Sequence, residues 1–327
     1  MTSLPTFTDV LLARQTIAPY LRPSPLYDYQ SLSDKVGAQI WVKHENHLPT
    51  GAFKVRGGLV YMDALRRRAP NVEGIVSATR GNHGQSLAFA GARFGLSVTI
   101  VAPQGNSREK NAAMRALGAN LIEHGRDFQA AREEADRLAA ERGLHFVPSF
   151  HRDLALGVST YALELLSEHP ELDALYAPIG QGSGVCGCIA ARDALGLKTE
   201  IVGVQATGAP AYALSFAAGR VTSTASADTL ADGMATRVPD AEALEVINRG
   251  AARVTLVRDE EIAAAIRAYW TDAHNLAEGA GAAALAAAIK ERASLKGRKV
   301  GVVLSGGNID FDLFQRWVAV AQSAAAA

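Results

Sequence analysis

One lysine of this chain lies in a setting that suits covalent chemistry. Lys54 stands between Phe53 and Val55, and nearby glycines allow the backbone to approach a ligand closely. Burial among apolar groups removes water from the ammonium, which lowers its pKa and frees the amine to form a Schiff base. Most lysines are solvated surface residues. The segment therefore indicates a catalytic lysine only if other ligand-binding segments accompany it.

A glycine-rich turn, Gly180–Gly184, is the best candidate for binding a phosphate. It follows the apolar run Leu175–Ile179 and precedes the helical stretch Val185–Leu195, so its backbone N–H groups can converge on an anion at a helix N-terminus. A tight turn without a ligand is the alternative. A dinucleotide is disfavoured, because the next strand ends in Gln205 instead of an acidic residue and the Gly-x-Gly-x-x-Gly spacing is missing. We expect a single phosphate monoester.

Three further segments place glycine beside polar side chains at the ends of predicted elements. They are Pro49–Gly58, which contains the lysine, Ser77–Gln85 and Ser305–Asn308. Ligands of open α/β sheets bind at the carboxyl ends of the strands. We therefore expect these segments and the glycine turn to form one site.

Short apolar runs alternate with longer segments of helical period along most of the chain, a pattern typical of parallel strands joined by helical crossovers. The predicted strands are Gln39–Lys43, Gly74–Ala78, Ser97–Ala102, Asn120–Glu123, His145–Val147, Leu175–Ile179, Glu200–Gln205, Arg253–Val257 and Lys299–Leu304. Helices with charges opposite an apolar face are predicted over Ser107–Leu117, Phe128–Arg142, Val158–Ser167, Glu260–Ala273 and Ala280–Arg292. An α/β fold with a largely parallel sheet follows.

The chain is long enough for two domains. Residues 70–150 hold four strand–helix alternations of their own and could form a smaller sheet inserted into a larger one. We predict a large domain from residues 1–46 and 152–327 and a small domain from residues 47–151. No linker rich in proline, glycine or serine marks the boundary.

Composition and charge exclude some classes of binding partner and some cellular locations. Lys+Arg 33 balance Asp+Glu 33, which disfavours nucleic-acid or acidic-membrane partners. Residues 1–20 lack the continuous apolar stretch of a signal peptide, and Gly279–Ile289 is about half the length of a membrane span. The only cysteines, Cys186 and Cys188, are too few for a disulfide framework. We expect a cytoplasmic protein with a small-molecule partner.

Taken together, the four segments resemble the serine/threonine dehydratase family of fold-type II pyridoxal-phosphate enzymes, which includes threonine deaminases and serine racemase. The family motif Ser/Ala-Phe-Lys-x-Arg-Gly corresponds to Ala52–Gly57, Gly-Asn-His to Gly81–His83 and Ser-Gly-Gly-Asn to Ser305–Asn308. The motifs stand in the family's order over nearly the whole chain. The resemblance implies two open, twisted, mostly parallel sheets flanked by helices, as in the tryptophan synthase β subunit, with pyridoxal 5'-phosphate as cofactor and a homodimer as assembly.

The resemblance also implies a role for several residues. Lys54 would bind the cofactor covalently and later act as general base, with Phe53 beside it. Asn82 would hydrogen-bond the ring's 3-hydroxyl, and Ser305 would face the pyridine nitrogen. Glu278 matches a family glutamate near the ring, although a charge at the start of the following helix is an alternative. The phosphate would bind the backbone N–H groups of Gly180, Gln181, Gly182, Ser183 and Gly184.

The loop Thr79–His83 would bind the substrate's α-carboxylate through the Thr79 hydroxyl, the backbone of Gly81 and the start of the helix. His83 either takes part or only caps that helix. Arg80 departs from serine racemase, which has serine there, and an arginine is a poor proton shuttle, so racemisation is disfavoured. Arg80 points a bidentate donor at the α-carboxylate or at a distal one, as in hydroxyaspartate, or else forms a salt bridge or is solvated.

Several relatives hold a divalent cation through a glutamate at a strand end and an aspartate shortly after it. Here the corresponding residues are Gln205 and Ala211, so we expect no metal site. The chain ends soon after the helix that follows Ser305, so we also expect no C-terminal regulatory domain.

The resemblance implies a pyridoxal-phosphate-dependent ammonia-lyase that converts a β-hydroxy-α-amino acid to a 2-oxo acid and ammonia. The substrate would resemble serine or threonine, with hydroxyaspartate and phenylserine in the range considered. One alternative is a β-replacement synthase of the cysteine-synthase type, which usually has threonine where His83 stands. An amino-acid racemase and a non-catalytic ligand-binding relative are the others, and intact Lys54, Asn82 and Ser305 argue against the last.

Overall fold

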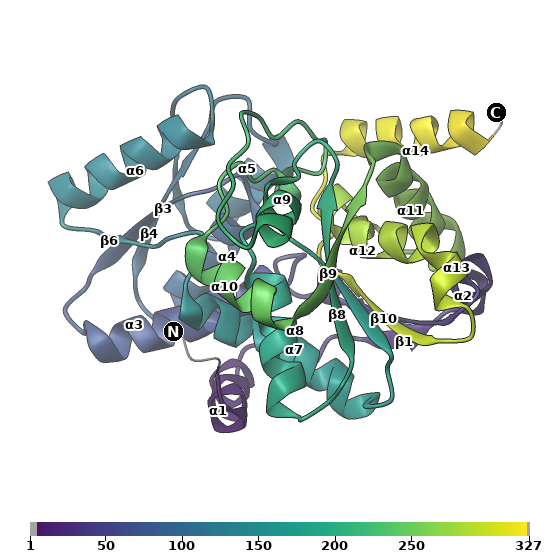
Figure 1. Cartoon of the computed structure of the whole chain (residues 1–327). Coiled ribbons are helices and arrows are strands. Elements are labelled where there is room, and N and C mark those ends of the chain that lie inside the picture. The colour runs from purple at the N-terminus through teal and green to yellow at the C-terminus, as the bar shows by residue number, and fades with distance from the viewer. Residues whose placement is uncertain (1–4, 326–327) are drawn as a thin grey trace.

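Two largely parallel sheets, each covered by helices, form the molecule (Figure 1). The computed structural model describes residues 5–325. The larger sheet has the strand order β1-β2-β10-β7-β8-β9 and the smaller one β5-β4-β3-β6, and only β1 runs antiparallel to its neighbour. The strands are β1 Leu26–Asp28, β2 Gln39–His44, β3 Gly74–Ala78, β4 Ser97–Ala102, β5 Asn120–Glu123, β6 His145–Phe146, β7 Ala174–Pro178, β8 Glu200–Ala206, β9 Ala251–Val257 and β10 Lys299–Leu304.

Every predicted strand is present, with ends shifted by two residues at most. The apolar runs become central strands, and each residue of β3 and β7 is buried because helices cover both faces of a parallel sheet. The edge strand β1 was not predicted, since three residues are too few to show an alternating pattern. The α/β fold predicted from the sequence is confirmed.

Fourteen α-helices and two 3₁₀ turns connect the strands among residues 5–325. The 3₁₀ turns are Glu45–His47 and Asp232–Met234. The helices are α1 Phe7–Ile17, α2 Gln30–Val36, α3 Lys54–Arg68, α4 Asn82–Arg93, α5 Arg108–Ala116, α6 Phe128–Arg142, α7 Arg152–Glu168, α8 Ser183–Ala194, α9 Ala211–Ala218, α10 Ala241–Gly250, α11 Asp259–Asp272, α12 Gly279–Lys290, α13 Arg292–Leu295 and α14 Phe311–Ala325.

Helix α7 shows where sequence patterning failed. It begins at Arg152 instead of the predicted Val158, because the His151 side chain accepts a hydrogen bond from the backbone N–H of Asp153 and caps the first turn. Gly157 lowers the helical signal of that turn. Glycine is required at this position because α3 and α7 pack closely there: a Cβ on residue 157 would lie 2.8 Å from the backbone carbonyl carbon of Arg56 in α3. The lysine-bearing helix thus approaches α7 closely.

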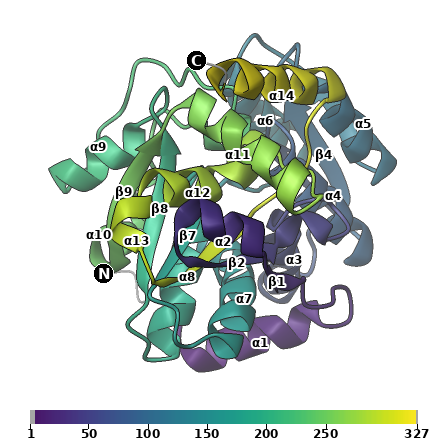
Figure 2. The ribbon, with the colours of Figure 1, turned by 90° about the vertical axis from the view of Figure 1, so that its right-hand side faces the viewer.

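Helices α2, α11 and α12 lie in front of the larger sheet in Figure 2, and α7, α8 and α10 cover its other face. No helix among residues 5–325 has both the length and the apolar character needed to cross a membrane.

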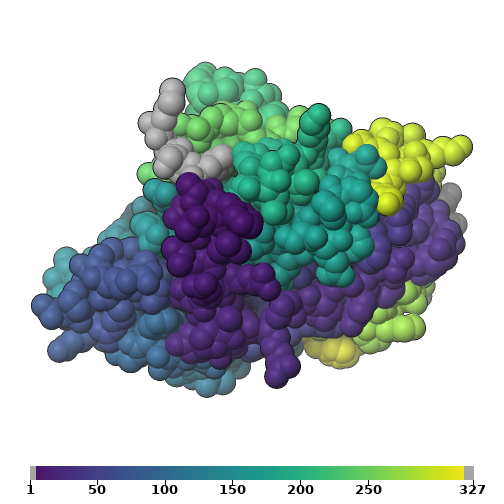
Figure 3. Space-filling model, turned by 90° about the horizontal axis from the view of Figure 1, so that it is seen from below, coloured from purple at the N-terminus to yellow at the C-terminus, as the bar shows by residue number. Residues whose placement is uncertain are grey.

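Helix α1 packs on the cores of both sheets. Its Val10 belongs to the core under α7 and α8, whereas Ala13 and Ile17 belong to the core beneath the smaller sheet. Figure 3 shows this N-terminal segment between the blue and the teal parts of the chain. All four strands of the smaller sheet come from residues 74–146. The predicted domain boundaries, whose outermost residues lie outside the described chain, stay a prediction.

Candidate active site

Every site residue predicted from the sequence lines one cavity of about 140 Å³, located where β3, β7 and β10 end. These carboxyl ends lie together because β10 pairs with β7 in the larger sheet and β3 ends facing them from the smaller one. The predicted residues in its wall are Phe53, Lys54, Thr79, Arg80, Gly81, Asn82, His83, Gly180, Gln181, Gly182, Ser183, Gly184, Glu278 and Ser305.

Backbone hydrogen bonds join the lysine segment to the segment that follows β10. The N–H of Phe53 donates to the carbonyl of Ser305 at 3.0 Å, and the N–H of Gly307 donates to the carbonyl of Gly51 at 2.9 Å. A short antiparallel bridge lies between these bonds. Two segments about 250 residues apart in the sequence are therefore held in fixed register beside the cavity.

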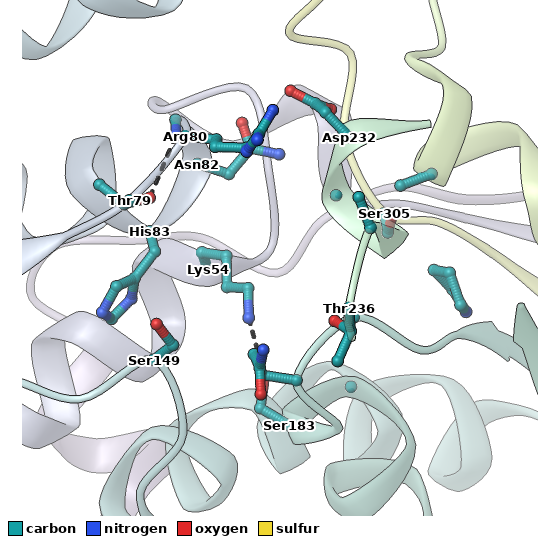
Figure 4. Close-up of a pocket in the computed structure, with 18 of the residues that line it drawn as sticks. Lys54, Thr79, Arg80, Asn82, His83, Ser149, Ser183, Asp232, Thr236 and Ser305 are labelled. Carbon is teal, nitrogen blue, oxygen red and sulfur yellow. Dashed lines mark hydrogen bonds between the residues drawn. The ribbon is translucent and has the colours of Figure 1, made fainter. Parts of the chain in front are cut away.

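The amine of Lys54 lies between Asn82 and Ser183 in the view of Figure 4. Lys54 is the first residue of α3, and its Nζ donates a hydrogen bond of 3.0 Å to the Ser183 hydroxyl. The ring of Phe53 lies 5.0 Å from the same nitrogen. Desolvation by the surrounding protein lowers the pKa of Lys54 to about 8, because burial penalises the charged form. About one in ten of these amines is therefore neutral at pH 7.

The glycine turn presents backbone N–H groups that have no protein acceptor. Residues 180–184 donate no backbone hydrogen bond to any of the described residues, and 183 and 184 form the first turn of α8, where N–H groups point out of the helix. Gly182 has φ +100°, in the left-handed region that favours glycine. The turn therefore offers several convergent donors at a helix N-terminus, which suits a phosphate.

Asn82 is oriented by two other residues of the site. Its Nδ2 donates to Glu278 Oε1 at 2.5 Å, and its Oδ1 accepts from Asn308 Nδ2 at 2.9 Å. Asn308 also donates to the Thr50 carbonyl at 2.8 Å. The Gly-Asn-His, lysine and Ser-Gly-Gly-Asn segments thus meet in one network of hydrogen bonds.

Glu278 is buried and belongs to an ionic cluster that sequence analysis missed. Lys110 of α5 lies 3.1 Å from Glu278 and 2.7 Å from Asp232, and both Lys110 and Asp232 also line the cavity. Burial raises the pKa of Glu278, while the Lys110 ammonium opposes this shift. Lys110 lies in a charged stretch typical of a surface helix, so nothing in the sequence pattern indicates its burial.

His83 is buried in the second position of α4, and its side chain does not cap the helix. The interpretation of His83 as a cap is therefore wrong. Its Nε2 has no hydrogen-bond partner among the described residues. Burial, with a smaller effect of the Lys54 charge, lowers the pKa of His83 to about 3, so the imidazole is neutral at physiological pH.

Thr79, which is buried, and Arg80, which is exposed, line the same cavity. The Thr79 hydroxyl accepts from the Gly81 backbone N–H at 3.1 Å, and the Arg80 carbonyl accepts from Asn106 Nδ2 at 3.1 Å. The Arg80 side chain is exposed, and no carboxylate of residues 5–325 lies within ion-pair distance of it. The salt bridge considered for Arg80 is thus absent from the described part of the chain.

The cavity wall also contains residues that the motifs do not include. Phe128, Ser149 and Thr236 come from α6 and from loops outside the four segments. No spacing rule links these positions to the lysine, because the fold alone brings them together.

Gln205, which the sequence comparison placed where several relatives have a metal-binding glutamate, is buried near the end of β8. Its Oε1 accepts from the backbone N–H of Ala213 in the first turn of α9 at 3.0 Å, so the side chain serves as a helix-capping amide. No cluster of three metal-ligating side chains occurs among residues 5–325.

The cavity has the donor set that pyridoxal phosphate requires: a desolvated lysine amine near a turn with unpaired N–H donors. The family model described as "Pyridoxal-phosphate dependent enzyme" matches residues 17–306, and the chain belongs to this family.

Two curated relatives are ammonia-lyases. The chain is 33% identical over 315 residues to the L-threonine ammonia-lyase of Thermotoga maritima, covering 95% of this chain and 77% of the relative. It is 31% identical to the L-threo-3-hydroxyaspartate ammonia-lyase of Saccharomyces cerevisiae, covering 94% of both.

Among solved structures, the processed form of threonine deaminase isoform 2 from Solanum lycopersicum superposes with a TM-score of 0.91 at 28% identity, over 97% of this chain and 87% of that one. The two-sheet architecture of fold-type II enzymes predicted from the sequence is confirmed.

Proposed function

We propose that this chain is an ammonia-lyase that converts a β-hydroxy-α-amino acid to a 2-oxo acid and ammonia. The observation that carries the proposal is the desolvated Lys54 amine in one cavity with the unpaired N–H donors of residues 180–184. The activities named for the two curated relatives support it. The substrate loses the Cα proton and the β-hydroxyl, and the released enamine exchanges its nitrogen for the oxygen of water.

Lys54 is the general base of this reaction. When bound, pyridoxal phosphate supplies a ring that takes up the negative charge developing at Cα. Lys54 Nζ takes the Cα proton, since its lowered pKa keeps part of the amine unprotonated. The hydrogen bond to Ser183 keeps the nitrogen on one side of the cavity.

Other residues of the cavity are suited to bind the cofactor and to orient the substrate. The N–H groups of residues 180–184 would hold the phosphate of the bound cofactor, and Asn82, whose amide is fixed by Glu278, would orient its ring. Thr79 accepts a hydrogen bond from Gly81, which leaves its own hydroxyl proton free for the substrate α-carboxylate.

The decisive experiment is a 2-oxo acid release assay with serine, threonine, 3-hydroxyaspartate and phenylserine. The holoenzyme is expected to release 2-oxo acid and ammonia in equal amounts from at least one of them, and Lys54→Ala to lose this activity. If no β-hydroxy amino acid yields a 2-oxo acid while cofactor is bound, the lyase proposal is wrong. Replacement of the β-hydroxyl by an added thiol, to give a thioether that keeps its α-amino group, would instead favour a β-replacement synthase.

We also propose a cytoplasmic homodimer that acts on an amino acid without nucleic-acid or membrane partners. The buried free thiols of Cys186 and Cys188 and the balanced charge support this, and the dimer follows from the family resemblance. Light scattering on the eluting protein tests the assembly, since a monomeric mass would contradict it.

A further inference from the structure

A second cavity of about 670 Å³ adjoins the proposed active site. The two cavities share wall residues, among them Arg80, Ser149, Gln181 and Asp232. The outer cavity extends from the shared rim between the start of α6 and the loop that precedes α10. A substituent on the substrate's β-carbon can therefore reach beyond the inner site.

The available charge in the outer cavity is positive. Arg80, Arg132 and Arg237 line it, and none of the three forms an ion pair with a carboxylate of residues 5–325. Arg237 donates only to a backbone carbonyl, that of Thr224, at 3.3 Å. Three guanidinium groups therefore line this cavity without an ion pair, and Arg237 acts on the Asp127 carboxylate only through a minor, longer-range charge interaction.

The three aspartates that line the same cavity already interact with other groups of the protein. Asp127 caps α6 by accepting from the Ala130 N–H at 2.9 Å, and Asp240 caps α10 by accepting from the Ala243 N–H at 3.0 Å. Asp232 pairs with Lys110 at 2.7 Å. These carboxylates already have partners in the protein, which leaves the exposed arginines open to an anionic ligand.

Arg80 is the one arginine among the described residues that borders both cavities. Its backbone is held by the hydrogen bonds from Asn106 to its carbonyl and from the neighbouring Gly81 N–H to Thr79. A guanidinium is permanently charged and has no acceptor, so its chemistry is the binding of an anion and not proton transfer. Its rigid fork matches the two oxygens of a carboxylate.

We propose that Arg80 is a specificity-determining residue that binds a second carboxylate, carried on the β-carbon of the substrate. The substrate class is then a β-hydroxy-α-amino dicarboxylic acid. Serine and threonine carry no charge beyond the α-carboxylate and leave Arg80 unpaired. This assignment rests on the proposed lyase function and narrows it.

The test compares kcat/KM for 3-hydroxyaspartate with that for serine and threonine in the holoenzyme and its variants. Loss of a charge-assisted carboxylate contact reduces binding about 10- to 100-fold. In Arg80→Ala, the loss on 3-hydroxyaspartate is therefore expected to exceed the loss on the neutral substrates by this factor. Arg80→Lys, which keeps the charge but not the fork, is expected to lie in between.

Arg132→Ala is the matched control, because Arg132 borders the outer cavity alone. It is expected to change the ratio of acidic to neutral turnover less than about threefold, as for a screened rim charge. Equal losses of Arg80→Ala on all substrates would assign Arg80 to the α-carboxylate and overturn the proposal. An equally large selective loss of activity on 3-hydroxyaspartate in Arg132→Ala would also overturn the proposal. It would show that the selectivity comes from the overall positive charge of the cavity and not from a contact with Arg80.

A second measurement does not depend on turnover. Succinate, which carries two carboxylates and no amine, is expected to bind the holoenzyme and to lose affinity about tenfold or more in Arg80→Ala, by calorimetry. Unchanged affinity in Arg80→Ala would contradict the proposal. If the wild type releases 2-oxo acid from serine or threonine but not from 3-hydroxyaspartate, only this inference fails; if it releases none from any substrate, the lyase function fails.

Discussion

At the scale of single residues, the chemistry of the site follows from desolvation. Lys54 has a pKa near 8 because the fold removes water from its ammonium, with Ser183 as its neutral hydrogen-bond partner. The motif around Lys54 could be recognised from the sequence. The pairing of Glu278 with Lys110 and Asp232 could not, because the three residues lie in unrelated segments and Lys110 and Asp232 look like ordinary surface charges.

The lowered pKa of Lys54 predicts how cofactor uptake depends on pH. The neutral amine attacks the aldehyde, so its fraction sets the rate: about one in ten at pH 7 with a pKa near 8, against about one in 3,000 for an ordinary lysine. The rate of reconstitution from apoprotein, followed by visible absorbance, is expected to rise with pH, to reach half its maximum near pH 8 and to level off above about pH 9. A continued rise toward pH 10 would show that Lys54 is solvated.

Gln205 predicts the response to metal removal. Because its amide caps α9 and Ala211 stands where a carboxylate would be needed, a divalent cation finds no charged oxygen ligands there. The holoenzyme is expected to keep its rate of 2-oxo acid release after treatment with EDTA. A large drop that magnesium reverses would disprove this prediction.

At the scale of elements, glycines decide where helices begin and how closely they pack. Most strands and the longer helices could be predicted from apolar runs, and α6 has its predicted bounds. The start of α8 could not be predicted, because Ser183 and Gly184 are residue types typical of loops and yet form the first turn of this helix. Their N–H groups point at the cavity because the turn before them is left-handed at Gly182.

Gly182→Ala tests this element directly. A Cβ there would lie 2.7 Å from the Ala243 Cβ and would hold a left-handed conformation, so we expect about 1–3 kcal/mol of destabilisation and at least about tenfold weaker cofactor binding. Gly196→Ala at the other end of α8 is the control, since its φ is +66° with open space around it. This control is expected to lose about 1 kcal/mol of stability and no cofactor affinity. Equal cofactor affinities, measured by fluorescence titration, would contradict the assignment of this turn to the phosphate.

At the scale of the whole molecule, a buried ionic cluster ties the lysine helix to the larger sheet. Arg56 of α3 lies 2.7 Å from Glu45, which follows β2, and 2.7 Å from Glu164 of α7. Lys43 adds a pair of 2.6 Å with Glu164. Sequence analysis identified Arg56 only as part of the family motif. Its partners Glu45 and Glu164 could not be predicted, because the packing of α7 against α3 brings them together.

Arg56→Met is expected to destabilise the protein by about 3–5 kcal/mol, because it leaves the buried Glu45 carboxylate without its cation and Glu164 with Lys43 alone. The exposed pair of Arg115 and Glu123 gives the control, and Arg115→Met is expected to cost less than about 1 kcal/mol. Urea denaturation measures both. Similar midpoints for the two variants would show that the buried cluster does not stabilise the fold.

The same cluster sets a pH dependence. Burial raises the pKa of Glu164, but Arg56 and Lys43 outweigh burial and hold it below its usual value of 4.5. The stability that Glu164 contributes is thus present above pH 4.5 and is lost as pH falls through the lower folded-state pKa. In Arg56→Met, the loss is expected to begin at higher pH. Identical acid-denaturation profiles would refute this.

The central claim is that Lys54 carries the cofactor, and one measurement tests it most directly. The protein loaded with pyridoxal phosphate is reduced with borohydride, digested and mapped by mass spectrometry. We expect the pyridoxyl group on the peptide that contains Lys54, with the other cavity lysine, Lys110, unmodified. Labelling of Lys110 or of a surface lysine in its place, with Lys54 free, would contradict the account.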